Sequence, residues 1–197
     1  QKGEGEREGW PLRAPVVCVM GHVDHGKTTL LDALRRSRVA AAEAGGITQR
    51  LGAFHIASAA EGEEGREGGL GVTVLDTPGH AAFGAMRAHG AQATDIVLLV
   101  VSAVDGLQEQ TKEIVRLLAE QREEMEEGGG REGGGGPSLM VAVTKVDKLG
   151  GKEEVMEAMG KIVHALAAEG VMCEDLGGEG QVVPVSAPTG EGLEELM

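Results

Sequence analysis

The chain has 197 residues, of which 41% are hydrophobic and only 2% aromatic. This length fits one domain whose core is built from aliphatic side chains. The chain has 18 Lys and Arg against 32 Asp and Glu, so its net charge is −14. A chain this acidic is not expected to bind DNA or an anionic membrane through its overall field. Two cysteines in apolar contexts and no apolar run of about 18 residues argue against a disulfide framework and against a membrane protein.

Short apolar runs alternate along the chain with segments of helical periodicity. Residues 1–13 are rich in Gly, Glu and Arg and predict a disordered lead-in. The apolar runs predict strands over 15–20, 51–57, 70–75, 96–101, 139–143 and 182–185. The helical patterns cover 28–36, 108–124 and 153–169. This alternation predicts a three-layer α/β domain over 14–197, with a mostly parallel central sheet flanked by helices.

Two segments interrupt this pattern. Residues 58–69 and 123–137 are rich in Gly, Glu and Arg and predict flexible loop insertions. An acidic docking arm for a basic partner is the alternative interpretation. Near the end of the chain, residues 192–196 predict the start of a helix that Met197 cuts short.

The first strand is followed by a phosphate-binding motif. Residues 21–28 read Gly-His-Val-Asp-His-Gly-Lys-Thr and match the pattern G-x-x-x-x-G-K-[ST]. Glycines allow the backbone to wrap a phosphate, and the amides of the loop and of the next helix offer positive ends. Lys27 is expected to reach the β- and γ-phosphates, and the Thr28 hydroxyl to ligate Mg²⁺.

Further polar motifs follow later strands. Asp76 and Gly79 stand after the 70–75 strand, where a carboxylate holds Mg²⁺ through water and an amide meets a γ-phosphate. Lys145 and Asp147 follow the 139–143 strand. A carboxylate there accepts two hydrogen bonds from guanine, and adenine has neither donor, so it would be rejected. With Ser186-Ala187 last, these motifs have the order of a P-loop GTPase domain.

The sequence also resembles the G domain of bacterial-type translation initiation factor two. The resemblance rests on residues 21–28, 45–49 (Gly-Gly-Ile-Thr-Gln), 76–80, 85–91 and 94–97. It implies GTP or GDP with Mg²⁺ as ligands, and GTP hydrolysis that is slow without the ribosome. It implies that initiator tRNA and the ribosome are bound through domains absent from these residues. It assigns the nucleotide to Gly21, His22, Val23, Asp24, His25, Gly26, Lys27, Thr28, Thr29, Asp76, Gly79, Thr144, Lys145, Asp147, Ser186, Ala187 and Pro188.

The resemblance also assigns the catalytic and metal-binding roles. His80 is expected to orient the attacking water, with Lys27 neutralising phosphate charge and Thr48 closing on the γ-phosphate. The Mg²⁺ ligands are then Thr28, Thr48 and Asp76. Asp24 is similar to an aspartate that helps hold a monovalent cation, and a solvated loop acid is the alternative.

Three positions depart from the family pattern. Thr144 stands where Asn is usual, and its shorter hydroxyl predicts nucleotide binding weaker by about 1 kcal/mol. Pro188 replaces a frequent Lys, and Ala81 replaces a usual Glu. A nucleotide switch without useful hydrolysis and an inactive fragment stay open as alternatives to the GTPase. We expect a cytoplasmic or organellar protein, in a mitochondrion or chloroplast, and not a secreted one.

Overall fold

The fold is a six-stranded sheet with helices on both faces. The computed structural model describes residues 13–35, 52–56, 71–76, 94–127 and 137–197. The strands are β1 (Val16–Gly21), β2 (Gly52–Ile56), β3 (Val72–Asp76), β4 (Ile96–Ser102), β5 (Ser138–Thr144) and β6 (Gln181–Pro184). They lie in the order β2-β3-β1-β4-β5-β6. Only the β2–β3 pair is antiparallel among these strands, so the predicted mostly parallel sheet is confirmed.

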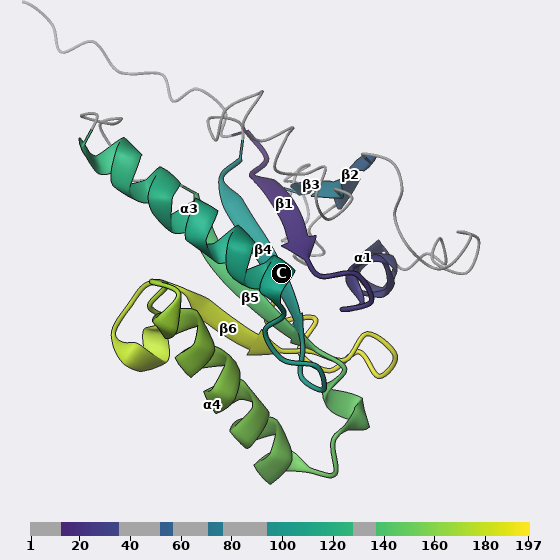
Figure 1. Cartoon of the computed structure of the whole chain (residues 1–197). Helices are drawn as coiled ribbons and strands as arrows, with labels where there is room; N and C mark the ends of the chain where they lie inside the picture. The colour runs from purple at the N-terminus through teal and green to yellow at the C-terminus, as the bar shows by residue number, and fades with distance from the viewer. Residues whose placement is uncertain (1–12, 36–51, 57–70, 77–93, 128–136) are drawn as a thin grey trace, which may run out of the picture.

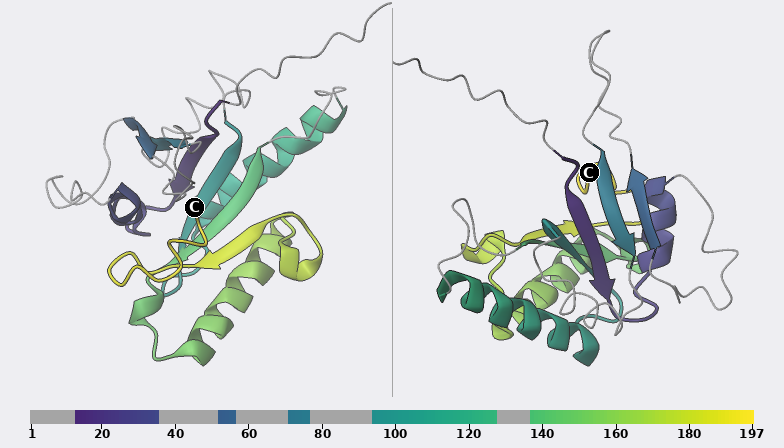
Figure 2. Two further views of the ribbon diagram at one scale, coloured as in Figure 1. Left: turned by 180° about the vertical axis from the view of Figure 1, so that it is seen from behind. Right: turned by 90° about the horizontal axis from the view of Figure 1, so that it is seen from above.

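Three α-helices in the described residues complete the layers. These are α1 (Lys27–Arg35), α3 (Glu109–Glu127) and α4 (Lys152–Ala168). In Figures 1 and 2, α3 and α4 lie together on one face of the sheet and α1 lies on the other. This arrangement brings the carboxyl ends of the parallel strands to one edge, where the segments that follow β1, β4 and β5 meet.

The core is aliphatic and lies on both faces of the central strands. In β4, Val97, Leu99 and Val101 pack with α3 and α4, while Leu98 and Val100 pack with α1. Successive residues of a strand point to opposite faces, so a strand covered on both sides must be apolar throughout. This explains the unbroken apolar runs in the sequence and confirms the prediction of a core with few aromatic residues.

The structure corrects three of the predicted boundaries. Helix α3 continues to Glu127, so the first residues of the predicted 123–137 insertion are helical; Glu and Arg favour helices, and Gly128 begins the glycine run. Residues 192–196 form turns rather than a helix, because Gly190 and Gly192 both have positive φ angles, 83° and 72°. Arg13, placed in the disordered lead-in, makes a two-point ion pair with Asp95 at 2.6 Å.

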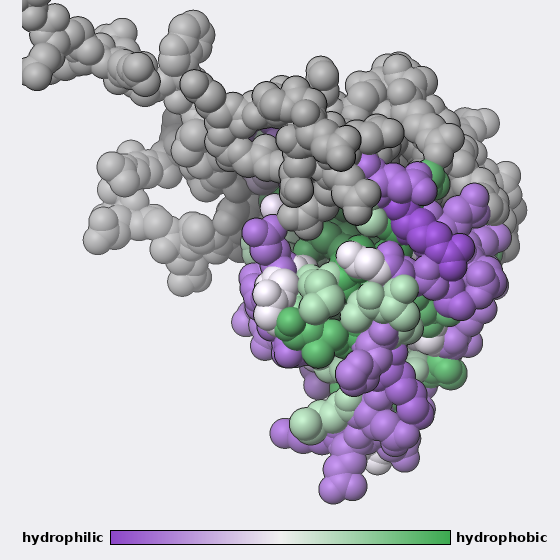
Figure 3. Space-filling view, turned by 60° about the vertical axis from the view of Figure 1, so that its left-hand side comes forward, coloured by the Kyte–Doolittle hydropathy of each residue, from purple (hydrophilic) through white to green (hydrophobic). Residues whose placement is uncertain are grey.

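Apolar side chains also reach the surface. In Figure 3, hydrophobic residues gather at the centre of the visible face, with hydrophilic residues beside and below them. One hollow of about 780 Å³ lies between the β4–α3 loop and α4, and one of about 290 Å³ lies beside Met172. Neither hollow is lined by residues 21–28. No helix within the described ranges is long and apolar enough to cross a membrane.

Candidate functional site

The loop between β1 and α1 folds back on the carboxyl edge of the sheet. It needs glycine at its start, where Gly21 has a φ of 145° and an added Cβ would lie 2.3 Å from the Val100 carbonyl oxygen of β4. Further on, Asp24 and Gly26 have φ angles of 64° and 86°. These left-handed residues reverse the chain into α1, so the loop wraps the space in front of the helix.

The amino end of α1 and one lysine supply the positive charge of this loop. The first amides of a helix have no partners within it and attract anions. Lys27 lies in the first turn of α1 and is buried together with Thr28. The Lys27 Nζ donates to the Gly21 and His22 carbonyl oxygens at 2.9 and 2.6 Å. A buried ammonium held by backbone carbonyls at a helix amino terminus fits a phosphate, which would offer it stronger, charged acceptors.

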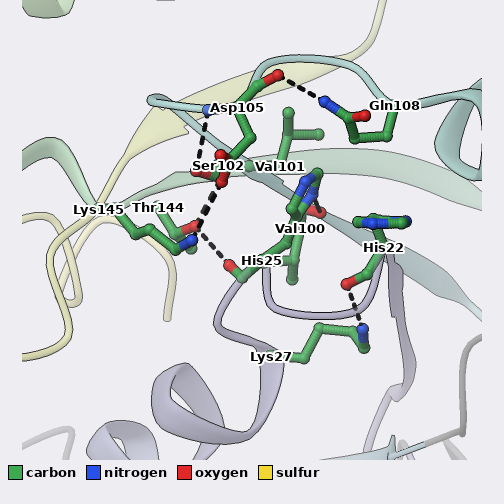
Figure 4. A network of polar contacts seen from close by, with 10 residues as sticks. All are labelled: His22, His25, Lys27, Val100, Val101, Ser102, Asp105, Gln108, Thr144 and Lys145. Carbon is green, nitrogen blue, oxygen red and sulfur yellow. Dashed lines mark hydrogen bonds and ion pairs between the residues drawn. The ribbon is translucent and has the colours of Figure 1, made fainter.

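A hydrogen bond joins this loop to the segment that follows β5. The buried Thr144 hydroxyl donates to the His25 carbonyl oxygen at 2.6 Å, and its other neighbour is the Val101 carbonyl oxygen at 3.3 Å (Figure 4). The sequence predicted nucleotide binding weaker by about 1 kcal/mol with this hydroxyl in place of an Asn amide. In the structure the hydroxyl does reach the loop, so we expect a smaller loss, and the affinity itself stays a prediction.

The segment after β5 also presents a carboxylate. Lys145 has a left-handed conformation with φ 62°, and a 3₁₀ turn over Val146–Lys148 follows it. The Asp147 carboxylate accepts a hydrogen bond of 2.8 Å from the Ser186 hydroxyl. Ser186 is buried and follows β6, the neighbour of β5 in the sheet. Ala187 comes next and is half-buried, and Pro188 is exposed.

Two histidines of the loop are close to each other, with ring centroids 5.0 Å apart. His22 Nδ1 lies 2.5 Å from Gln110 Oε1 of α3. His25 is buried, and this burial lowers its pKa to about 4 despite a 3.3 Å contact between Nδ1 and the Val100 carbonyl oxygen. Its Nε2 has no hydrogen-bond partner in the described part of the chain. The ring is therefore neutral near pH 7 and acts as packing beneath the loop.

The remaining predicted residues divide into two groups. Val23, Asp24 and Thr29 are exposed on or beside the loop. Asp76 ends β3 and is in register with Val19 of β1, so its backbone lies near the same edge. Thr48, Gly79 and His80, the residues predicted for catalysis and for the response to the γ-phosphate, lie outside the described residues. So do residues 1–12 of the predicted lead-in and residues 58–69 of the first predicted insertion.

The residues from the end of β4 to the start of α3 border the site and were not predicted to belong to it. Among them, Ser102, Asp105 and Gln110 contact site residues or one another. Their position directly after a buried strand was the available signal, because the segments after parallel strands meet at one edge.

The sequence matches a known protein family, and the structure is similar to solved structures. Residues 12–126, more than half of the chain, match the family model of the elongation factor Tu GTP binding domain. The structure is similar to GDP-bound aIF5B from Aeropyrum pernix, with 33% identity and a TM-score of 0.66, over 94% of this chain and 34% of that one. It is also similar to the bacterial selenocysteine-specific elongation factor EF-Sec, with 26% identity and a TM-score of 0.64, over 94% of this chain and 28% of that one.

A third solved structure shares the fold alone. It is elongation factor SelB from Methanococcus maripaludis in complex with the GTP analogue GPPNHP, with 24% identity and a TM-score of 0.59, over 95% of this chain and 33% of that one. The chain thus spans about a third of the length of these translation factors. The aIF5B structure and the elongation factor EF-Sec both match, so the common finding is the G domain of a translational GTPase.

Proposed function

Because the chain belongs to the family of the elongation factor Tu GTP-binding domain, we propose that it binds GTP and GDP and hydrolyses GTP as a module of a translation initiation factor. The observation that carries nucleotide binding is the bond from Thr144 to the His25 carbonyl oxygen. This bond joins the proposed phosphate-binding loop, residues 21–28, to the segment after β5, in which the Asp147 carboxylate is the proposed acceptor for a base. One ligand with a polyphosphate and a base would satisfy both parts.

The phosphate end of the site uses the loop and the start of α1. Lys27 exchanges its two carbonyl partners for phosphate oxygens, and the amides of residues 21–29 surround the phosphates. The Thr28 hydroxyl, the Asp76 carboxylate and Thr48 would hold Mg²⁺, since a hard ion prefers oxygen ligands. When bound, Mg²⁺ neutralises charge on the phosphates. Asp24, exposed with a left-handed backbone, is the proposed partner of a monovalent cation.

The base end of the site selects guanine. Asp147 accepts from the guanine N1–H and the 2-amino group, while Ser186 holds the carboxylate from the other side. Lys145 lays its alkyl stem over the base, and the backbone of Ala187 and Pro188 borders it. Adenine lacks both donors, so a desolvated carboxylate would reject it.

Hydrolysis depends on residues outside the described part of the chain. His80 orients the attacking water, and Thr48 and Gly79 respond to the γ-phosphate. Phosphoryl transfer mainly needs positioning and charge neutralisation. The sequence offers no arginine finger, so we expect slow hydrolysis until the ribosome completes the site. The GTP and GDP forms then differ in the order of the segments around Thr48 and Gly79.

Two features support an initiation factor over an elongation factor. Residues 45–49 and 85–91 carry the motifs that resemble initiation factor two, and the aIF5B structure has a higher identity than the EF-Sec structure, 33% against 26%. In such a factor the protein promotes initiator tRNA binding and joining of the ribosomal subunits. We assign the contacts with tRNA and the ribosome to parts of the factor beyond these 197 residues, in the cytoplasm or an organelle.

The first test is a titration of the chain with fluorescent GDP, GTP and ATP in Mg²⁺. We expect binding of both guanine nucleotides, none of ATP, and loss of binding in Lys27→Ala. Lys161→Ala is the matched control, because it removes an exposed lysine of α4 that pairs with Glu157. A folded chain that binds no nucleotide, or binds ATP equally well, contradicts the proposal.

A second test separates a hydrolysing enzyme from a binding switch. His80→Ala should keep guanine nucleotide affinity and lose turnover. The measurement is phosphate release from GTP with ribosomes, in the factor that contains this chain. Equal turnover in the variant and the parent protein would contradict the role of His80. No turnover in either would favour a switch that binds without hydrolysing.

A further inference from the structure

The loop after β4 carries an acidic residue to which the proposed function gives no role. Asp105 Oδ2 lies 3.1 Å from the Nζ of Lys145. The two residues come from different loops, one after β4 and one after β5, and these strands are neighbours in the sheet. The pair therefore bridges two loops at the carboxyl edge, beside the bond from Thr144 to the P-loop (Figure 4).

Asp105 is fixed in place by its own loop. Its amide donates to the hydroxyl oxygen of Ser102, which is buried, at 3.2 Å. Its carbonyl oxygen accepts from the Gln108 side chain at 2.7 Å, and the Gly106 amide donates to the Ser102 carbonyl oxygen at 2.8 Å. Hydrogen bonding from Ser102 and then from Lys145 lowers the pKa of the Asp105 carboxyl below its ordinary value. The carboxylate is thus charged at neutral pH and held in a defined position.

Lys145 is constrained at the backbone and at the tip of its side chain. Its left-handed φ of 62° sets the direction in which the side chain leaves β5. The ion pair sets where the ammonium ends, and only 23% of the side chain is exposed. A free lysine side chain loses about 2 kcal/mol of rotamer entropy when it is ordered. A lysine that is already ordered loses less when a base docks against its stem.

We propose that Asp105 is a positioning residue for the nucleotide base: it holds the ammonium of Lys145 so that the lysine stem is extended before the nucleotide arrives. This inference rests on the proposed function, in which the Lys145 stem covers the guanine. The effect is moderate, because the Asp105 side chain is 45% exposed and partly exposed ion pairs are weak. It adds an affinity determinant on the loop that links β4 to α3.

The test is a double-mutant cycle between Asp105→Asn and Lys145→Ala, read from the dissociation rate of fluorescent GDP. Asp105→Asn keeps the shape and removes the charge, so we expect dissociation that is about two- to five-fold faster, as for a partly exposed ion pair. Lys145→Ala should be faster still. In the Lys145→Ala background, Asp105→Asn should change nothing, because the residue acts only through the lysine.

Two controls separate positioning from a general effect of charge or folding. Glu157→Gln removes another acid that pairs with a lysine, at 2.8 Å on α4, and should leave dissociation unchanged. In about 1 M KCl, where the Debye length is about 3 Å, the difference in dissociation rate between the parent chain and Asp105→Asn should become smaller. The melting temperature without nucleotide should be equal in both.

Three results would overturn the inference. The first is an unchanged or slower GDP dissociation in Asp105→Asn. The second is that Asp105→Asn accelerates GDP dissociation equally in the parent chain and in the Lys145→Ala background. The third is that the faster dissociation of Asp105→Asn comes with a lower melting temperature without nucleotide. Each leaves the proposed function intact as long as the parent chain binds GDP. A parent chain that binds no guanine nucleotide overturns both the function and the inference.

Discussion

The hydroxyl of Thr144 donates a hydrogen bond of 2.6 Å to the carbonyl oxygen of His25, across 119 positions of sequence. Both residues are buried. The bond holds the P-loop against the segment that carries Lys145 and Asp147, so the two halves of the proposed site are set at a fixed separation. A short side chain makes this contact directly, because β5 delivers Thr144 next to the loop.

This bond predicts a graded response at position 144. Thr144→Val keeps the shape and removes the donor, so we expect GDP affinity to fall by about 1–2 kcal/mol, or roughly 5- to 30-fold. Thr144→Ser keeps the donor and should stay within about three-fold of the parent chain. Thr144→Asn should gain little, since the contact already exists. Isothermal titration with GDP measures all three, and equal affinity in Thr144→Val would contradict this role.

Gly21 predicts a steric effect on folding. An added Cβ would lie 2.3 Å from the Val100 carbonyl oxygen, inside the central β1–β4 pair. Gly21→Ala should therefore reduce the free energy of unfolding by about 3 kcal/mol or more. Gly160→Ala in α4 is the control, because its Cβ would meet nothing within 4 Å; it should stabilise by about 0.5–1 kcal/mol. Urea denaturation measures both, and similar small effects would show that the close approach does not matter.

The buried imidazole of His25 predicts a dependence of stability on pH. Burial lowers its pKa to about 4 in the folded chain, while the unfolded chain keeps a value of about 6.5. Below about pH 6.5, His25 therefore binds a proton in the unfolded chain, while in the folded chain it stays neutral down to about pH 4. The free energy of unfolding should fall between about pH 6.5 and pH 4, by on the order of 3 kcal/mol from this group.

The His25→Gln variant isolates this contribution, because glutamine does not titrate. The measurement is urea denaturation of the variant and the parent chain at pH 7, 5.5 and 4.5. The acidic side chains give both proteins a common pH dependence. The difference between their slopes of unfolding free energy against pH therefore reports on His25. Parallel slopes over this range would mean that the ring is not kept neutral.

Asp147 predicts the choice of base. Asp147→Asn replaces an acceptor oxygen with an amino donor facing the guanine donors, so GDP affinity should fall by about 100-fold or more. Xanthosine diphosphate, which has a carbonyl oxygen at C2, should bind the variant better than the parent chain. Ser186→Ala removes only the 2.8 Å bond to the carboxylate and should cost about five-fold in GDP affinity. Competition against fluorescent GDP measures these effects. Xanthosine diphosphate binding that stays unchanged would contradict the proposed pairing.

The sequence was sufficient for the parts of the fold that depend on local patterns. Apolar runs predicted the central strands β1, β4 and β5 most directly, because parallel strands buried on both faces admit few polar residues. The turn after β1 followed from Gly21 and Lys27, whose spacing has a specific mechanism. The last predicted helix, over 192–196, is a series of turns, and Gly190 and Gly192 have positive φ angles there. The helical spacing of the leucines does not reveal this backbone conformation.

Contacts between distant loops were beyond the reach of the sequence. Asp105, the partner of Lys145, is 40 positions away in the sequence, and no motif around Asp105 predicts this ion pair. The reach of the Thr144 hydroxyl was not apparent for the same reason, because it depends on how closely β5 brings its end to the P-loop. The sequence names side chains at an edge of the sheet, and three-dimensional packing decides which of them touch.

The central place of β1 has a consequence for biosynthesis. Its partners are residues 73–76 of β3 and 96–100 of β4, so the strand is made long before either neighbour exists. This apolar segment has no strand partner until roughly 55 further residues are translated, and its second partner needs roughly 80, because non-local strand pairing requires both segments. Such exposed segments aggregate readily. We therefore expect the nascent chain to depend on chaperone protection until β4 has left the ribosomal tunnel.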